Sequence, residues 1–199
     1  MHHKLEKYLY KKYPVLFEEH SLPMIKTSMC WGISCENGWL MLLDNLCYQI
    51  TNHIEQQHQL IIYVKEQEKK YFDMGNPIDV RPNNVKEKVQ QVKFKQVKEK
   101  FGMLRVYFSG GDETIKNMVN FAENLSKYIC EECGKFDATV GKTTKGWLRT
   151  VCYDCNSVSK KNNNSWKLFK QNKELSNILK RSMESKKKNL SYGVLEKKS

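Results

Sequence analysis

Residues 130–155 read CEECGKFDATVGKTTKGWLRTVCYDC, and this stretch indicates how the later part of the chain folds. It contains two Cys-x-x-Cys pairs, Cys130/Cys133 and Cys152/Cys155, separated by 18 residues. The spacing is typical of structural zinc sites, because two residues between thiolates let one tight turn direct both sulfurs at a single ion. We therefore predict a closed tetrathiolate Zn²⁺ site with no open position for water.

The segment between the two pairs predicts a zinc ribbon. Residues 136–140 and 147–151 are strand-like, and a stretch containing two glycines, 141–146, separates them. Basic and acidic side chains balance within the ribbon, so any contact with phosphate is expected elsewhere in the chain. Buried or redox-active thiols are the alternative interpretation of the same four cysteines.

The preceding part, residues 1–129, is predicted to be one α+β domain. A short helix is expected over 4–13, and apolar residues recur at helical spacing over 38–58. The next stretch, 60–72, either extends that helix or begins another. Asn37 is the candidate N-cap of the long helix.

A β-hairpin is predicted in the second half of this domain. Its strands are expected at 89–97 and 103–108, with Gly102 available for positive φ in the connection. Asp112 follows a Ser-Gly-Gly stop and is a natural N-cap for an amphipathic helix that leads into the cysteines. Phosphate binding by the glycines is the alternative function of this turn.

Positive charge is concentrated near the C-terminal end. The chain of 199 residues carries 34 Lys and Arg against 22 Asp and Glu, a net charge of +12. Residues 156–199 hold 12 basic and 3 acidic side chains, so they account for +9 of this charge. We expect a basic tail, partly helical (from Trp166 onward) or disordered, that contacts nucleic acid or another acidic partner or only aids solubility. The candidate nucleic-acid-binding residues are Lys180, Arg181, Lys186, Lys187 and Lys188.

Composition excludes several classes of protein. Hydrophobic residues make up 40% of the chain, enough for a packed core. No run approaches the ~20 apolar residues of a membrane span, and the first residues lack the apolar part of a secretory signal. Seven cysteines, an odd number, argue against a disulfide framework. We therefore expect a cytoplasmic protein with no membrane partner.

Other side chains allow more than one interpretation. Cys30, Cys35 and Cys47 either form a second metal site with His20 or His53, or are core or incidental thiols, which the apolar helix face around Cys47 favours. Core packing is expected for three tryptophans, with base stacking as the alternative: Trp31, Trp39 and Trp147. One predicted sheet face is either basic or simply solvated: Lys98, Lys100 and Arg105.

The motifs of several enzyme classes are absent from the sequence. All five histidines lie within residues 2–58, so the ribbon has no imidazole for metal-dependent nuclease chemistry. The zinc deaminase, nucleophile-elbow and H-E-x-x-H signatures are also missing. We assign no catalytic residue. A nucleotide-handling enzyme would require Arg105, Asp112 and Glu113 to converge in one pocket.

Several longer motifs occur in order along the chain. They are Tyr13-Pro-Val-Leu-Phe17, Cys30-Trp-Gly-Ile-Ser-Cys-Glu-Asn-Gly-Trp39, Val97-Lys-Glu-Lys-Phe-Gly-Met-Leu-Arg-Val-Tyr107, Cys130-Glu-Glu-Cys-Gly134 and Gly146-Trp-Leu-Arg-Thr-Val-Cys152. Over about residues 8–155 the chain resembles a family of small uncharacterised proteins encoded by phages, prophages and bacteria. The resemblance implies a zinc-ribbon-like element near the C-terminus but no activity.

Together these patterns predict three parts: an α+β domain at 1–129, a zinc-ribbon-like element at 130–155 and a basic tail at 156–199. The leading functional hypothesis is a non-enzymatic, zinc-stabilised binding protein that contacts nucleic acid or an acidic partner through its tail. The second is a phage-type inhibitor or decoy that binds a host protein in the cytoplasm. The nucleotide-handling enzyme is the third.

Overall fold

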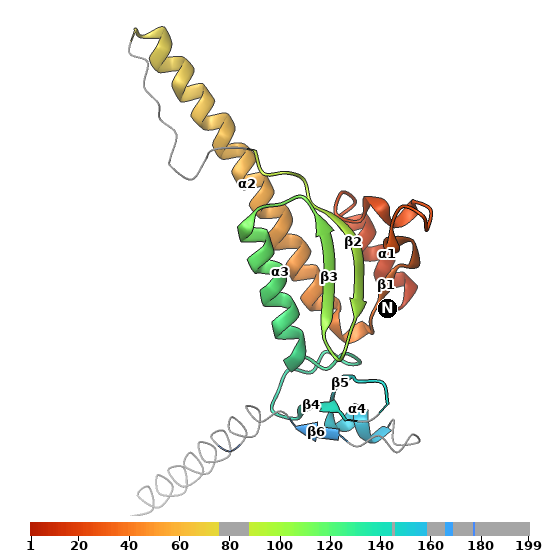
Figure 1. Ribbon diagram of the computed structural model, residues 1–199. Helices are drawn as coiled ribbons and strands as arrows, with labels where there is room; N and C mark the ends of the chain where they lie inside the picture. Colours follow the sequence, from red (N-terminus) through yellow and green to blue (C-terminus); the bar gives the residue numbers. More distant parts are fainter. Residues whose placement is uncertain (76–87, 145, 159–165, 169–176, 178–199) are drawn as a thin grey trace, which may run out of the picture.

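The protein has a mixed helix and strand fold, as predicted (Figure 1). The structure is a computed structural model that describes residues 1–75, 88–144, 146–158, 166–168 and 177. The strands form two small sheets, ordered β1-β2-β3 and β5-β4-β6. None of the helices within the described residues has the length and apolar character needed to span a membrane.

The N-terminal segment wraps one edge of the first sheet. Helix α1 ends just before Pro14, as predicted, and short 3-10 turns then carry the chain to a two-residue strand. This segment consists of α1 (His3–Lys12), η1 (Glu18–Ser21), η2 (Ser28–Trp31), β1 (Ile33–Ser34) and η3 (Asn37–Trp39). The predicted irregular stretch 22–37 therefore contains a strand, β1, which pairs in parallel with β2.

Helix α2 (Leu40–Asp73) is one continuous helix, so residues 60–72 extend the first predicted helix. Its sheet-facing stripe buries apolar side chains at helical spacing: Leu43, Leu46, Cys47, Ile50 and Ile54. The predicted Asn37 cap was wrong. Asn37 lies in η3, where its Oδ1 accepts a hydrogen bond from the backbone N–H of His2 at 2.8 Å.

The predicted hairpin is present as β2 (Lys93–Glu99) and β3 (Leu104–Ser109), although β2 begins four residues later than expected. Asp112 does cap α3 (Glu113–Leu125), because its Oδ1 accepts the N–H of Ile115 at 3.0 Å. The 3-10 turn η4 (Ser126–Tyr128) then leads into the cysteines.

One hydrophobic core unites these elements. Helices α2 and α3 lie side by side against the hairpin, and the N-terminal segment flanks the β2 side (Figure 1). The hairpin contributes Phe94, Val97 and Leu104, which are fully buried in this core. We call residues 1–75 and 88–129 the body.

The remaining described residues, 130–144, 146–158 and 166–168, form the cysteine element. It contains β4 (Val140–Thr143), β5 (Thr150–Cys152), α4 (Tyr153–Val158) and β6 (Trp166–Leu168). The predicted strands were too early by a few residues. The Asp137 carboxylate accepts from both the N–H and the hydroxyl of Thr139, which turns the chain before β4 begins.

The predicted boundary at residue 155 does not coincide with the end of this element. Helix α4 continues to Val158, and Trp166–Leu168 adds a third strand that pairs antiparallel with β4. These residues were predicted to begin a helix, and that prediction was wrong. Strand pairing with β4 satisfies backbone groups that an isolated edge would leave open.

Candidate metal centre

The first Cys-x-x-Cys pair lies on a tight turn directly after η4. The N–H of Cys130 donates to the carbonyl of Lys135 at 2.8 Å, and the N–H of Gly134 donates to the carbonyl of Cys130 at 2.8 Å. Gly134 has a φ of +78°, which residues with a Cβ rarely adopt. The turn therefore directs Cys130 and Cys133 to the same side.

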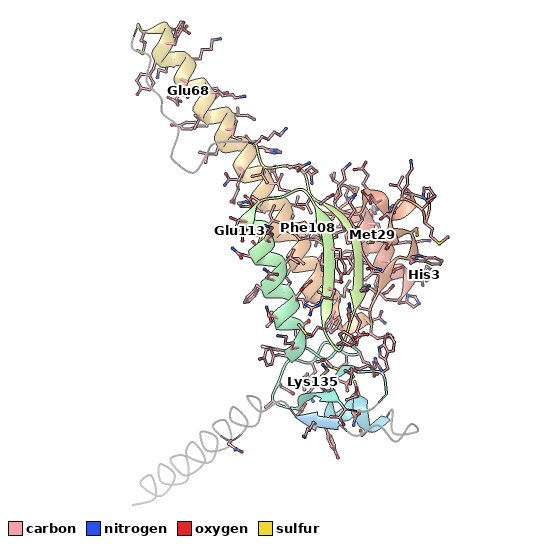
Figure 2. All side chains as sticks on the ribbon, in the orientation of Figure 1. His3, Met29, Glu68, Phe108, Glu113 and Lys135 are labelled. Carbon is pink, nitrogen blue, oxygen red and sulfur yellow. The ribbon has the colours of Figure 1, made fainter. Side chains whose placement is uncertain are left out.

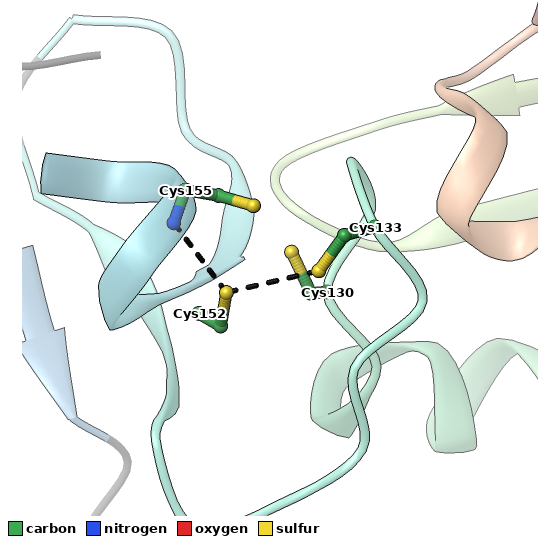
Figure 3. Close-up of side chains that lie close together, drawn as sticks. All are labelled: Cys130, Cys133, Cys152 and Cys155. Carbon is green, nitrogen blue, oxygen red and sulfur yellow. Dashed lines mark hydrogen bonds between the residues drawn. The ribbon is translucent and has the colours of Figure 1, made fainter. Parts of the chain in front are cut away.

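The second pair lies where β5 passes into α4. Cys152 is the last residue of β5, and Cys155 lies in the first turn of α4. The N–H of Cys155 points at the Cys152 sulfur over 3.5 Å. Strand and helix thus present these two sulfurs toward the first pair, as Figure 3 shows.

The four sulfurs converge within a space that fits one ion. All lie within 4.8 Å of one another, and the Sγ atoms of Cys133 and Cys152 are 3.8 Å apart. A tetrahedron with Zn–S bonds of about 2.3 Å has sulfur–sulfur edges of about 3.8 Å. The distance is far too long for a disulfide, and all four cysteines are free thiols. The donor set therefore fits a structural metal ion.

The local environment shifts the pKa values of the thiols in different directions. Burial alone would raise the pKa of Cys133, but the backbone N–H of Lys135 and hydrogen bonds from the other three thiols hold that pKa below its ordinary value. Burial raises the pKa of Cys130. A divalent ion would favour the thiolate at every position, because its charge lies closer to the sulfurs than any side-chain cation.

The first cysteine turn is packed against η3, directly before α2. The N–H of Gly38 donates to the carbonyl of Glu131 at 2.7 Å, and the indole N–H of Trp39 donates to the carbonyl of Ile129 at 3.0 Å. A Cβ on Gly38 would lie only 2.2 Å from the carbonyl oxygen of Cys130. Only glycine allows this approach, so the contact joins the metal-binding turn to the body.

A buried carboxyl group lies in the same contact. Glu131 is 3% exposed, and one of its oxygens accepts the N–H of Glu36 at 3.2 Å. The other oxygen accepts no hydrogen bond and lies 3.9 Å from the Arg149 guanidinium. Burial raises the pKa of Glu131 to about 7.

The β2–β3 turn makes the second contact between the body and the cysteine element. The hydroxyl of Thr150 donates to the carbonyl of Gly102 at 2.6 Å. Trp147, in the β4–β5 loop, donates its indole N–H to a carboxylate oxygen of Glu99 at 2.8 Å. The end of β2, the β2–β3 turn and η3 therefore position the metal-binding residues.

The other cysteines do not form a second centre. Within the described residues, the four-cysteine group is the single cluster of three or more potential metal ligands. Cys47 is fully buried on α2, and burial raises the pKa of Cys35 to about 12. Cys30 donates its S–H to the carbonyl of Thr27. The structure thus favours the interpretation of these three as structural thiols.

The histidines named as partners for that second site have other contacts. The ring of His20 lies against the ring of Tyr10, with centroids 4.4 Å apart. His53 lies 2.8 Å from the carboxylate of Asp112. Neither residue belongs to the cysteine group.

The three residues of the enzyme hypothesis are not brought together. Asp112 and Glu113 lie at the start of α3, and Figure 2 shows Glu113 at the end of that helix remote from the cysteine element. Arg105 instead pairs with Glu123 in the last turns of α3, at 2.6 Å. The candidate tail residues Lys180, Arg181, Lys186, Lys187 and Lys188 lie outside the described residues.

Sequence reasoning missed the residues that attach the cysteine element to the body. Gly38 and Trp39 belong to a motif quoted above, but nothing in the local pattern shows that they contact residues 129–134, at least 90 positions later. The tryptophan prediction was only partly correct. Trp39 is buried, whereas Trp31 and Trp147 are 69% and 72% exposed.

Comparison with protein-family models, with curated proteins and with solved structures gives no match for this chain.

Proposed function

We propose that this chain is a non-enzymatic binding protein in which a structural Zn²⁺, held by the four cysteines, maintains a surface for nucleic acid, with the basic tail supplying attraction. The observation that carries the proposal is the convergence of four sulfurs within 4.8 Å. No described carboxylate or imidazole joins that group, so four sulfurs would complete a tetrahedral shell and leave no position for substrate or water.

Zinc is the ion that this donor set suits best among those that need no redox partner. Tetrahedral sites with four thiolates are typical of zinc or of iron–sulfur chemistry. Zinc-loaded protein is colourless, whereas iron in such a site absorbs visible light. Metal analysis together with an absorption spectrum of the purified chain therefore distinguishes the two.

Nucleic acid is the partner that the charge supports. The net charge of +12 attracts phosphate, and residues 156–199 carry +9 of it. The body and the cysteine element are close to neutral by comparison. We further propose that the resemblance to the phage, prophage and bacterial family reflects a shared metal-stabilised fold.

The test is the salt dependence of binding to a labelled oligonucleotide. Five glutamines replace the tail residues Lys180, Arg181, Lys186, Lys187 and Lys188. The logarithm of the binding constant falls linearly with the logarithm of the salt concentration. For a single strand, each lost phosphate contact is expected to reduce the magnitude of this slope by about 0.7.

The matched control keeps the tail and removes the same charge elsewhere. Five exposed lysines on α1 and α2 become glutamine: Lys4, Lys7, Lys11, Lys65 and Lys69. A specific role of the tail predicts a loss for the first variant only. Equal losses would show that only overall charge matters, and binding of a protein partner that is insensitive to salt would favour the inhibitor hypothesis.

A further inference from the structure

The β2–β3 turn holds Phe101 in a backbone conformation that residues with a side chain rarely adopt. Lys100 and Met103 exchange backbone hydrogen bonds at 2.8 and 3.2 Å, which leaves Phe101 and Gly102 as a two-residue loop. Their φ angles are +56° and +73°, so the loop has the type I′ form that prefers Asn-Gly. Phe101 is 65% exposed, so burial does not offset its strained backbone. A conflict of this kind is typical of a functional position.

A second exposed aromatic ring is fixed beside this turn. The Glu99 carboxylate accepts the N–H of Gly102 at 2.5 Å with one oxygen and the indole N–H of Trp147 at 2.8 Å with the other. Trp147 is 72% exposed, and it comes from the cysteine element, five residues before Cys152. One carboxylate therefore places two exposed rings, 46 residues apart in sequence, around the same turn.

Three lysines lie on or beside this hairpin. The Nζ of Lys100 lies 5.5 Å from the ring centre of Phe101, and the Nζ of Lys98 lies 5.4 Å from that of Tyr107. Lys142 also reaches the turn, because its Cε lies 3.1 Å from the position of a Cβ on Gly102. None of these three lysines pairs with a carboxylate belonging to the described part of the chain.

Lys98 and Tyr107 lie on the solvent side of the sheet. Their neighbours Val97 and Val106 face each other across the hairpin and are buried in the core, and side chains alternate along a strand. We call these residues, from the outer side of the hairpin through its turn to the cysteine element, the aromatic–lysine face: Lys98, Lys100, Phe101, Tyr107, Lys142 and Trp147. The three rings and Lys100 are exposed, and Lys98 and Lys142 are half-buried.

We propose that the aromatic–lysine face binds single-stranded nucleic acid by stacking bases on Phe101 and Trp147 while the lysines contact the phosphates. This proposal rests on the nucleic-acid role proposed above and adds where, and in which strand state, the ligand is held. Exposed rings with lysines beside them suit a ligand that alternates flat bases with anionic groups. In a duplex the faces of the bases are stacked on one another and cannot stack on Phe101 or Trp147. A duplex can therefore contact only the lysines, through its phosphates.

The metal ion would also contribute to binding indirectly, by positioning Trp147. Trp147 lies between β4 and β5, and the second of these strands ends at Cys152. A metal ion that holds β5 therefore also holds the indole against Glu99. Removal of the ion is expected to weaken single-strand binding without any ligand touching the metal.

The experiment uses the full, zinc-loaded chain and a labelled oligothymidylate of about 16 nucleotides, with a duplex of the same length for comparison. The key variant is Phe101→Asn, because asparagine suits the turn and so separates binding from folding. Affinity for the single strand should fall about tenfold while thermal stability stays equal or rises. Trp147→Leu should give a similar loss and remove most of the quenching of tryptophan fluorescence on binding.

The control is Phe121→Asn on α3, where the ring is also 69% exposed but lies on another element. It should leave binding unchanged. Unaltered single-strand affinity in both Phe101→Asn and Trp147→Leu would overturn the proposal, as would equal affinity for the duplex. If only the variant with five tail glutamines lost binding, the face would be refuted and the tail role would stand. Absence of binding to any oligonucleotide at low salt would refute both.

Discussion

The body and the cysteine element are each stabilised by a different kind of interaction. The body buries 21 residues in one core, from Leu9 in α1 to Ala122 in α3. The core of the cysteine element has four fully or nearly fully buried members, Cys130, Val140, Val151 and Cys152. Burial of two valines cannot offset the conformational entropy of ordering this element. The element therefore depends on its metal and on its contacts with the body.

This difference explains why the attachment consists of hydrogen bonds and a close approach of two backbones at a glycine. The small apolar core leaves the cysteine element little hydrophobic surface to bury against the body. Instead, Gly38 lets two backbones meet, and the hydroxyl of Thr150 reaches the carbonyl of Gly102. Such contacts are directional, so they fix the element in one orientation once its metal has shaped it.

Metal removal should have the largest effect on the cysteine element relative to the body. Chelation, or the substitution Cys133→Ser, is expected to unfold the cysteine element while the body stays folded, since metal affinity is folding free energy in such sites. The effect is large, because structural zinc contributes apparent free energies of about 10–16 kcal/mol in zinc-finger peptides. Hydrogen exchange should show lost protection at Val140 and Val151 but not at Leu43 or Ile50 of α2.

The matched control is Cys30→Ser, which alters a thiol outside the cluster and keeps a donor for the carbonyl of Thr27. This variant should retain one metal ion per chain. Protection that survives complete removal of metal would show that contacts with the body alone stabilise the element.

Much of this architecture can be predicted from local pattern. Helical periodicity predicted α2 and α3, two strand-like stretches joined through Gly102 predicted the hairpin, and the capping role of Asp112 was confirmed. The spacing of the cysteines predicted that four sulfurs meet, because each pair needs only one turn to form. These features depend on neighbours within a few residues.

The features that sequence reasoning missed depend on distant contacts. The two-residue strand β1 forms because Ile33 and Val97 meet across the sheet. Trp147 was expected in the core, yet it lies exposed against Glu99, a residue 48 positions earlier. Gly38 has its role only because residues 130–134 approach it. The residue pattern within one segment cannot predict contacts between segments that are distant in the sequence.

The attachment itself should be broken by Gly38→Ala. The added Cβ would lie 2.2 Å from the carbonyl oxygen of Cys130 and 2.5 Å from the backbone nitrogen of Gly134. Both are backbone atoms that cannot rotate away, so the two parts must separate at a cost of about 1–3 kcal/mol. Denaturant unfolding should show this loss, while the metal content remains one ion per chain.

Gly75→Ala is the comparison for this loss. Gly75 has a φ of +74°, so alanine there is strained, but no atom lies within 4 Å of its Cβ position. The loss at position 38 should exceed the loss at position 75, and hydrogen exchange should rise at 129–134 only in the first variant. Equal losses would mean that the close approach contributes little to holding the two parts together.

The smallest expected effect lies within the body, at the cap of α3. Asp112 accepts the N–H of Ile115 and lies 2.8 Å from the ring of His53. Asp112→Ala removes both contacts and should cost about 1 kcal/mol, whereas Asp112→Asn keeps a good N-cap and should cost less. Urea unfolding at neutral pH measures the two losses.

The same pair of variants tests the charge on Asp112. Burial would raise the pKa of this carboxyl, but the hydrogen bonds from His53 and from the N–H of Ile115 outweigh burial and lower it. Its stabilising contribution is therefore present above the unfolded-state pKa of about 3.8 and is lost as pH falls through the lower folded value. Asp112→Asn should thus differ from the parent at neutral pH and approach it in acid, and because acid releases metal from both chains alike, the difference between them isolates the body. A difference that stayed constant with pH would show that Asp112 acts through the geometry of its cap and not through its charge.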